Sequence, residues 1–480
     1  MYYRGVVRSR KKPLNFHEYV KDYFYRSSIP GLRHLVHSKR HPLETILWLA
    51  LMLFAVTITV SVITSNWQRY SANPSVVSLE KDFREWEFEF PAVTICYLNK
   101  VKESKAQEYI MTTWGVSNDS KTEYEYYMKF VETVVNMSYS SLENFKEFAE
   151  DVNLINIDME DLIEQVYFND TIQYSTDNSK HTLHRTMTAN ELGFCINYGS
   201  EAEKRISFRT NVTDVEKPKM CSFILNVCSA KFSLERQARV VITSAYEVPD
   251  ATNKQYETRV GYIYHLMVKN IQTVSSSEVR DLPIQRRRCR YFDEPESVGI
   301  PHYTYKLCTM KCRRKLAIKL CGCSPPFYRQ LNRPGRQKIC NIKGLICLGE
   351  NTGRLLKLID ANKRRMPCDC LPVCESLGFQ MLEDKFDNWT KSGGQKGMIL
   401  DVTLSEFGRI RYRRDVLFTF DDLLVSFGST ASFFMGCSIL SIVETFYFFT
   451  IRLVWYLWRR RQVLKAPEQR RQRLVVFSAH

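Results

Sequence analysis

An apolar stretch near the C-terminal end carries small and polar residues that a lipid-facing helix does not need. Residues 423–443 contain no charged side chain, and Glu444 follows them. Within the stretch Gly428, Ser432 and Gly436 are each four residues apart, so on a helix they form one stripe of small residues. One interpretation is a seam between closely packed helices, with the cysteine after Gly436 as an apolar filler.

A second interpretation is that the helix breaks at Gly436, Cys437 and Ser438. Backbone that leaves the helix at membrane depth must be buried or must line a water-filled cavity. A ring of carbonyl groups can replace the hydration shell of an ion, and intramembrane acids such as Glu444 usually face such a path. The packing seam and the ion path both stay open at this point.

Two segments are long and apolar enough to cross a bilayer. Residues 45–68 form an uncharged run of 24 residues, which suffices for a hydrocarbon core of about 30 Å. Residues 421–458 form the second span and begin with Asp421 and Asp422, which either attract cations to an outer mouth or simply cap a helix. Because two spans enclose no pore, an ion path requires a cyclic oligomer.

The basic residues of the chain gather in its two tails. The net charge is +16; residues 1–44 hold ten basic and three acidic residues, and residues 459–480 hold seven and one. Basic flanks of this kind predict a plasma-membrane protein with both tails in the cytoplasm and its spans in the lipid bilayer. The nearly neutral middle argues against a nucleic-acid partner.

Residues 69–420 are therefore expected outside the cell. Fourteen of the fifteen cysteines lie there, an even number that suits disulfides in an oxidising compartment. A zinc site is the alternative for the closely spaced cysteines, and the outer location argues against it. All five glycosylation sequons also lie there, at Asn118, Asn136, Asn169, Asn211 and Asn388.

The outer region has the pattern of an α+β domain. The spacing of apolar residues predicts a helix in residues 140–168, with Leu142, Phe145, Phe148 and Val152 on its buried face, and residues 238–247 and 258–268 read as strands. Residues 289–374 hold ten cysteines and form a disulfide-rich helical lobe. We predict two transmembrane helices flanking a large disulfide-rich α+β extracellular domain.

Within the lobe, two helical runs and an irregular segment carry the cysteines. Cys308 and Cys312 fall on one helix face, and the helix should end at Gly322. A second helical run covers residues 352–365, before Cys368, Cys370 and Cys374. The spacing alone leaves the disulfide pairing open.

Several motifs along nearly the whole chain resemble those of one family. They are "FPAVTICYLN" at 91–100, "GFCINYG" at 193–199, the cysteine series of the lobe, and "FDDLLVSFGSTASFFMGCSILSIVE" at 420–444. In this order, between two spans, the chain resembles the epithelial sodium channel, degenerin and acid-sensing channel family, most closely its insect pickpocket branch.

The resemblance implies an amiloride-sensitive, sodium-selective cation channel, with Na⁺ as the permeant ion and no cofactor. It implies a gated homo- or heterotrimer with related subunits. By position, Gly436, Cys437 and Ser438 would form the selectivity filter, Gly428, Ser432 and Glu444 would line the pore with Ser432 at the amiloride position, and Val425 would control gating.

The resemblance also implies the disulfide pairing. The expected pairs are Cys96–Cys195, Cys221–Cys228, Cys289–Cys374, Cys308–Cys370, Cys312–Cys368, Cys321–Cys347 and Cys323–Cys340. Cys221–Cys228 follows only because these two cysteines remain, and Cys437 would stay a free thiol.

Three positions depart from the family pattern. Pro30 and Gly31 stand where the family has His-Gly, a pair that affects gating. Arg286 replaces the tryptophan of the acid-sensing branch, and Ser426 replaces an acid that is common after Val425. These departures weaken the expectation of proton gating and leave the stimulus open, including an extracellular ligand of unknown identity.

The alternatives belong to other classes. A two-span lipid carrier resembling scavenger receptors shares the topology but needs no small-residue stripe, and an ATP-gated two-span channel has another cysteine order. An enzyme is not expected, because the sequence shows no phosphate-binding loop and no HExxH motif.

Overall fold

The computed structural model describes residues 16–36, 41–72, 75–117, 120–155, 157–168, 172–177, 183–206, 219–224, 228–296, 300–331, 338–389, 397–406 and 408–458. The chain divides into two compact units. One comprises residues 1–76 and 416–480, and the other comprises residues 77–415. Each unit is described by itself.

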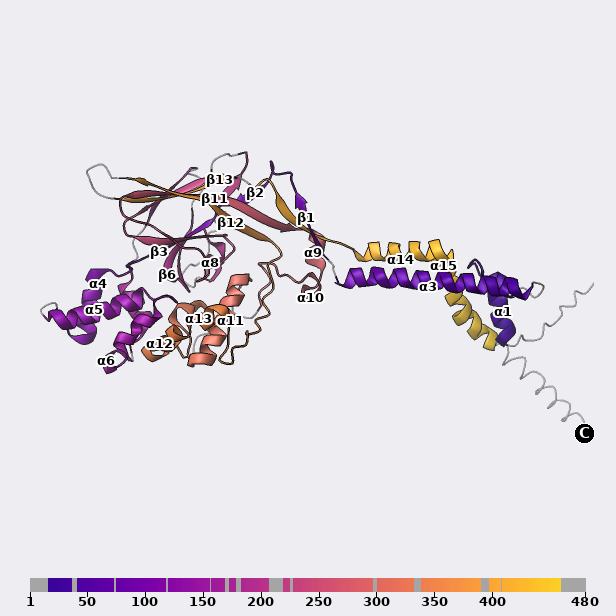
Figure 1. The fold of residues 1–480 in the computed structure, drawn as a ribbon, viewed down its shortest axis with the longest axis horizontal. Coiled ribbons are helices and arrows are strands. Elements are labelled where there is room, and N and C mark those ends of the chain that lie inside the picture. Colours follow the sequence, from indigo (N-terminus) through magenta and orange to yellow (C-terminus); the bar gives the residue numbers. More distant parts are fainter. Residues whose placement is uncertain are drawn as a thin grey trace, which may run out of the picture. The chain divides into compact units, whose positions relative to one another are not determined.

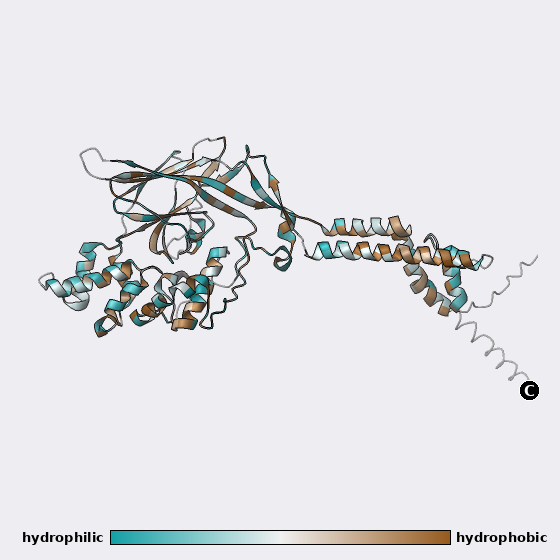
Figure 2. Cartoon of the chain, viewed as in Figure 1, coloured by the Kyte–Doolittle hydropathy of each residue, from teal (hydrophilic) through white to brown (hydrophobic). Residues whose placement is uncertain are grey.

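The first unit is helical. Its elements are α1 (Phe16–Arg26), α2 (Leu32–Val36), α3 (Pro42–Ala72), α14 (Phe420–Met435), α15 (Ile439–Tyr447) and the π-helical turn η3 (Phe448–Arg452). Two helical segments, Pro42–Ala72 and Ile439–Trp458, are long and apolar enough to span a membrane. Figure 2 shows hydrophobic residues along α3 and α15, as lipid-facing surfaces require.

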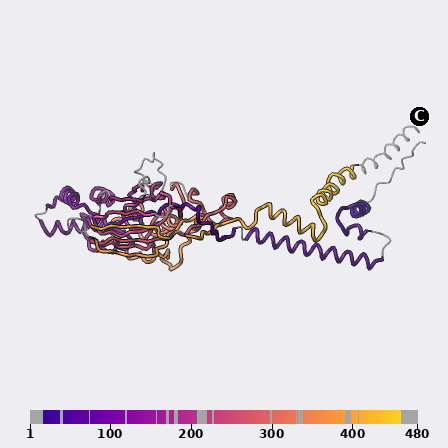
Figure 3. Tube along the Cα trace, turned by 90° about the horizontal axis from the view of Figure 1, so that it is seen from above, coloured from indigo at the N-terminus to yellow at the C-terminus, as the bar shows by residue number. Residues whose placement is uncertain are grey.

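The predicted second span is not one continuous helix. Its apolar stretch, residues 423–443, is divided between α14 and α15. Figures 1 and 3 both show α14 alongside α3 and a sharp turn of the chain before α15. The predicted first span, residues 45–68, lies entirely within α3.

The second unit contains three β-sheets. The seven-stranded sheet has the order β1-β14-β11-β13-β8-β4, with β12 paired to β11, and the five-stranded sheet has the order β10-β9-β3-β6-β5. The strands of the first are β1 (Ser75–Glu80), β4 (Gln173–Thr176), β8 (Ser229–Leu234), β11 (Tyr262–Ser275), β12 (Ser376–Asn388), β13 (Met398–Glu406) and β14 (Arg411–Val416). Those of the second are β3 (Ala92–Tyr97), β5 (Arg185–Asn190), β6 (Gly193–Tyr198), β9 (Ala238–Thr243) and β10 (Tyr256–Glu257), and β2 (Glu87–Glu89) pairs with β7 (Met220–Ser222).

Alternation of apolar side chains builds the core between the sheets. Strands β3 and β6 are buried along their whole length, as central strands covered on both faces must be. In β11 one face is buried, with Leu266 and Val268 packed against Leu400 and Val402 of the parallel strand β13. The apolar residues of both sheets therefore form one shared core.

The second unit also contains the helices α4 (Glu103–Trp114), α5 (Lys121–Val135), η1 (Leu142–Phe148), α6 (Val152–Ile155), α7 (Met159–Val166), α8 (Glu201–Ile206), α9 (Ser277–Asp281), α10 (Ile284–Arg287), α11 (Tyr305–Cys321), η2 (Pro326–Leu331), α12 (Ile342–Glu350) and α13 (Thr352–Lys357). All of them except α9 and α10 contribute to a second apolar core (Figure 1). Among these, α11, η2, α12 and α13 form the cysteine-rich lobe.

The predicted single helix in residues 140–168 is wrong in its extent. The segment forms the 3₁₀ helix η1 and the two short helices α6 and α7. Asp158 starts α7 afresh, because its carboxylate accepts from the backbone amides of Glu160 and Asp161. Val152, expected on the buried face, is 75% exposed.

Other predicted elements have different ends. The strand predicted in residues 238–247 stops at Thr243, and the one predicted in residues 258–268 is β11, which reaches Ser275. The second lobe helix stops at Lys357, because Leu358 adopts a positive φ of 55° that no helix continues through. Helix α11 ends at Gly322 in the left-handed conformation, as predicted.

Candidate functional site

The helix break lies at the three residues that the sequence singled out. Helix α14 ends at Met435, and Gly436 adopts φ +65°, a left-handed conformation that favours glycine. Ser438 then caps α15, because its hydroxyl accepts from the backbone amide of Ser441. Gly436, Cys437 and Ser438 therefore leave helical geometry inside the apolar stretch, where backbone must be buried or hydrated.

The N-terminal segment lies directly against this break. A Cβ atom on Gly436 would lie 2.7 Å from Cγ of Pro30. A Cβ atom on Gly31 would lie 2.6 Å from the sulfur of Met52 in α3, and Gly31 itself adopts φ +92°. A larger residue at Gly436 would therefore collide with Pro30, and one at Gly31 would collide with Met52.

Further contacts run from the N-terminal segment along α15. The Ser28 hydroxyl donates to the Ser441 hydroxyl at 2.9 Å, and the Ser28 amide donates to a carboxylate oxygen of Glu444 at 3.3 Å. One helical turn further, the Tyr23 hydroxyl and the Thr445 hydroxyl are 2.7 Å apart. Glu444 is therefore held by the chain's own N-terminal segment.

Helix α1 binds the π-helical turn that follows. The Tyr19 hydroxyl donates to the carbonyl oxygen of Phe448 at 2.6 Å, and its ring contacts the ring of Phe448. Asp22 pairs with Arg452 at 2.9 Å. Its negative charge balances the positive charge of Arg452, which lies among the apolar residues 445–458. Sequence reasoning missed these contacts. Arg452 alone signalled that an acidic partner was needed, without saying which one.

Two members of the stripe of small residues, Gly428 and Ser432, are not used for packing within the described part of the chain. Gly428 and Ser432 are exposed, and a Cβ atom on Gly428 would meet no described atom within 4 Å. Val425 is 69% exposed. On another face of α14 the Asn66 amide donates to the Ser426 hydroxyl at 2.8 Å and ties α14 to α3. Gly428 and Ser432 therefore stay open for water or for another subunit.

The two acids at the start of α14 differ in their surroundings. Asp422 completes a capping box, because its carboxylate accepts from the Thr419 amide while the Thr419 hydroxyl accepts from the Asp422 amide. Asp421 is exposed. Asp422 therefore has a structural role as a helix cap, and Asp421 is the acid that is free to face solvent.

The structure pairs the cysteines as expected: six pairs follow the family order, and Cys221 pairs with Cys228, the two that the family order left over. The seven disulfides are Cys96–Cys195, Cys221–Cys228, Cys289–Cys374, Cys308–Cys370, Cys312–Cys368, Cys321–Cys347 and Cys323–Cys340. Cys437 is a free, buried cysteine. Among the described residues no group of three or more His, Cys, Asp or Glu side chains could hold a metal ion.

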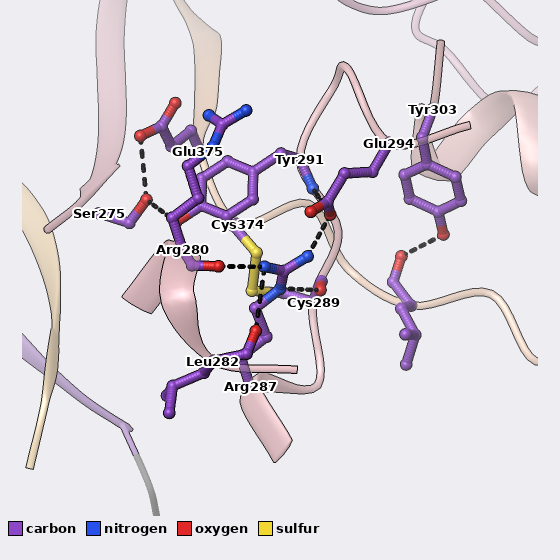
Figure 4. Close-up of a disulfide and its surroundings, with 11 residues drawn as sticks. Ser275, Arg280, Leu282, Arg287, Cys289, Tyr291, Glu294, Tyr303, Cys374 and Glu375 are labelled. Atoms are coloured by element: carbon purple, nitrogen blue, oxygen red, sulfur yellow. Dashed lines mark hydrogen bonds and ion pairs between the residues drawn. A yellow bond between two sulfur atoms is a disulfide. The ribbon is translucent and has the colours of Figure 1, made fainter. Parts of the chain in front are cut away.

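The lobe starts and ends at one point of the fold. Cys289 and Cys374 are cross-linked with their Cα atoms 5.0 Å apart. Arg290, the next residue after Cys289, forms two backbone hydrogen bonds with the end of the lobe. Its amide donates to the carbonyl oxygen of Pro372 at 3.0 Å, and its carbonyl oxygen accepts from the amide of Cys374 at 2.8 Å. Figure 4 shows this disulfide at the centre of a dense set of polar contacts.

A buried ion-pair cluster joins the lobe to the five-stranded sheet. Arg313 of α11 pairs with Glu191 at 2.5 Å and with Asp250 at 3.0 Å, and all three side chains are at most 3% exposed. Burial acts to raise the pKa of Asp250, but the charges of Lys306 and Arg313 outweigh it and hold that pKa below its usual value. The Tyr328 hydroxyl also donates to Glu191.

Glu203 of α8 is buried and has no cationic partner among the residues that the structure describes. One carboxylate oxygen accepts from the Thr188 hydroxyl at 2.7 Å, and the other has no partner among the described residues. Burial raises the pKa of Glu203 to about 7, against hydrogen bonds from Thr188 and Asn190 that lower it. This carboxyl therefore titrates near neutral pH.

The structure shows two of the predicted glycosylation sites. Asn388 is exposed at the end of β12. Asn136 is half-buried, and its side-chain oxygen accepts from the Lys100 amide at 3.0 Å. Asn118, Asn169 and Asn211 lie outside the described residues.

Comparison of the chain with known proteins shows which sequences and structures it is similar to. The family model described as "Amiloride-sensitive sodium channel" matches residues 23–448. Sodium channel protein Nach of Drosophila ananassae is 23% identical, over 94% of this chain and 89% of that protein. Pickpocket protein 19 of Drosophila melanogaster is 22% identical, over 94% of both chains. A solved proton-activated chloride channel aligns with 6% identity and a TM-score of 0.26, covering 83% of this chain and 95% of that one.

Proposed function

This chain belongs to the amiloride-sensitive sodium channel family. We propose that it is a subunit of a sodium-selective cation channel whose selectivity filter is formed by Gly436, Cys437 and Ser438. The family is one of membrane ion channels rather than enzymes, and the chain has two candidate spans. Family membership removes the lipid carrier and the ATP-gated channel as explanations.

The observation that carries the proposal is the break in the second span. Three residues leave the helix between α14 and α15, at a point flanked on both sides by apolar sequence. Backbone carbonyls freed from a helix are suitable ligands for a cation that sheds its water. We infer that Na⁺ is dehydrated at this level and that Glu444, held by Ser28, lies just beyond it.

The same geometry supports a proposal for the assembly. Two spans enclose no pore, and the stripe of Gly428 and Ser432 is unoccupied in the described part of the chain. Small residues permit close approach of helices from different subunits. We propose a trimer, formed by three copies or with related subunits, in which the second spans surround the pore.

We propose that the blocker-binding and gating positions lie on the exposed side of α14. Ser432 lies one helical turn before Gly436, and we propose that amiloride binds at this level. Val425 lies further toward the start of α14 and would control opening through its side-chain volume, because it is 69% exposed. Asp421 would raise the local cation concentration at the outer mouth.

We also propose that the protein lies in the plasma membrane with both termini in the cytoplasm. Helix α1 contacts the turn η3 through Tyr19 and Phe448, so the N-terminal segment and the far end of the second span lie on one side. The basic tails support the cytoplasmic assignment. The contact of Pro30 with Gly436 supports a role of the N-terminal segment in gating.

The test is to express the chain in oocytes and record currents while sodium and potassium are exchanged. We expect a sodium-preferring current that amiloride blocks and that loses its preference in Ser438→Leu. The matched control is Ser61→Leu, since Ser61 is an exposed serine of α3 away from the break. Unchanged selectivity in Ser438→Leu would remove Ser438 from the filter.

A further inference from the structure

The base of the lobe is organised around one buried guanidinium group. Arg287 is 4% exposed. Its Nε donates to the carbonyl oxygen of Cys289 at 3.0 Å, and Nη1 donates to those of Arg280 and Leu282 at 3.0 and 3.2 Å. Nη2 pairs with the carboxylate of Glu294. Arg287 thus fixes the chain before the lobe to the first residues inside it (Figure 4).

Tyr291 is held in place by these charged groups. Its backbone amide donates to the same Glu294 carboxylate at 2.9 Å. Its ring centre lies 4.7 Å from the guanidinium carbon of Arg280 and 4.9 Å from that of Arg287, within cation–π range of both. Because the ring is 3% exposed, the direction of its hydroxyl is fixed by this packing.

The hydroxyl of Tyr291 reaches the last residue of strand β11. It lies 2.8 Å from the Ser275 hydroxyl, which in turn donates to the Glu375 carboxylate at 2.9 Å. Glu375 directly follows Cys374, and β12 starts at the next residue. The side chain of Tyr291 therefore joins the start of the lobe to the strands on both sides of it.

Strand β11 pairs with β14, the strand that leads into the second span. Ser275 pairs with Arg414 in the parallel ladder of β11 and β14, and the Ser276 amide donates to the Arg414 carbonyl at 2.9 Å. Strand β14 ends at Val416, and α14 starts at Phe420. Only three residues of chain separate the end of β14 from the proposed pore helix.

We propose that Arg287 and Tyr291 are positioning residues for gating, through which a displacement of the lobe reaches α14 by way of Ser275 and β14. The inference rests on the proposed channel function. It commits to one route, from the disulfide-braced lobe to the second span. A rigid brace with no part in gating would show the same contacts, so the test must separate the two roles.

The first measurement is hydrogen exchange of the purified full chain in detergent, comparing Tyr291→Phe with Tyr303→Phe. Both changes remove one hydroxyl from the lobe. The Tyr303 hydroxyl donates at 2.6 Å to Leu371, within the lobe itself. Loss of one hydrogen bond should speed exchange of the amides in residues 274–276 and 411–416 about fivefold in Tyr291→Phe, and should leave it unchanged in Tyr303→Phe. Equal exchange in the two variants would overturn the proposal.

The second measurement is single-channel recording of the same variants at equal surface expression. We expect the open probability to change about fivefold in Tyr291→Phe, with the sodium reversal potential unaffected, and to stay at the wild-type value in Tyr303→Phe. Faster exchange with an unchanged open probability would overturn the proposal, because the junction would then be only a brace. If wild-type chains carry no cation current, the proposed function fails, and the exchange comparison still decides whether Tyr291 supports β14.

Arg287→Gln is the stronger perturbation of the same route. It leaves the Glu294 carboxylate without its cation. The increase in amide exchange and the change in open probability should therefore both be larger than in Tyr291→Phe. Tyr291→Phe keeps the test decisive if Arg287→Gln reaches the surface poorly.

Discussion

Replacing Gly436 by alanine should perturb the break for two separable reasons. At φ +65° an L-residue costs about 1–2 kcal/mol more than glycine. The new Cβ would also lie 2.7 Å from Cγ and 3.2 Å from Cδ of Pro30. Ordinary carbon contacts are about 3.5–4.0 Å, so the Pro30 ring must withdraw by roughly 1 Å. Pro30→Ala removes Cγ and Cδ, so it relieves the contact and leaves the backbone cost.

The assay is the sodium-to-potassium permeability ratio, measured with surface biotinylation for wild type, both single variants and the double variant. Gly436→Ala should lower the ratio or the current per surface channel, and Pro30→Ala in the same chain should recover part of the loss. The residual effect should correspond to the backbone cost, a factor of about 5–30 in the equilibrium that forms the break.

A matched control isolates the position of the substitution. Gly353→Ala in α13 adds a Cβ that meets no described atom within 4 Å, and Gly353 has no positive φ. It should behave as wild type. The reasoning is refuted if Gly436→Ala matches Gly353→Ala, or if Pro30→Ala recovers none of the loss.

Three further predictions concern the outer domain, and each is measured by thermal unfolding of the detergent-solubilised full chain. The folded-state pKa of Glu203, about 7, lies above its unfolded value, so its contribution to stability is complete below about pH 4.5 and is lost as the pH rises to 7. Glu203→Gln should remove roughly 3 kcal/mol of this pH dependence, whereas Glu201→Gln, on the same helix and paired with Arg205, should keep it. Arg313→Met leaves Glu191 and Asp250 buried without their shared cation and should cost about 3–5 kcal/mol; an equal cost for Lys315→Met, an exposed site on the same helix, would contradict this. Removing Cys308–Cys370 alone should cost about 2 kcal/mol, because Cys312–Cys368 still closes nearly the same loop; removing both should cost at least twice as much, and a single loss as large as the double one would contradict the idea that either disulfide can close this loop alone.

The spans, the break and the lobe helix were accessible from the sequence because each depends on local pattern. Uncharged length predicts a span, and a glycine between apolar runs permits a left-handed turn such as that of Gly436. Gly322 likewise marks the end of α11. The disulfide pairing was not a matter of spacing. Six pairs followed only from the order of cysteines in the family, and Cys221–Cys228 followed because these two cysteines remained.

Other features depend on contacts that no local pattern encodes. Ser28 and Glu444 are 416 residues apart, and Tyr19 and Phe448 are 429 apart, so neither pair leaves a periodic signal. Strand β12 was not predicted, because most of its side chains are exposed and its polar sequence does not alternate. It exists because its backbone pairs with β11 from Ser376 to Asn388. Val152 was misplaced because helical spacing was extended past residues that end the helix.

The close approach of Cys289 and Cys374 has a consequence for how this protein can be altered. Because the two Cα atoms are 5.0 Å apart, the chain leaves the β-sheet region at Cys289 and returns to it at almost the same point at Cys374. Helices beyond residue 294 can be exchanged with those of a relative without changing the connection between β11 and β12, provided that the contacts of Arg313 with Glu191 and Asp250 are kept. Diversity of response among subunits can therefore accumulate in the lobe while the conducting path stays the same.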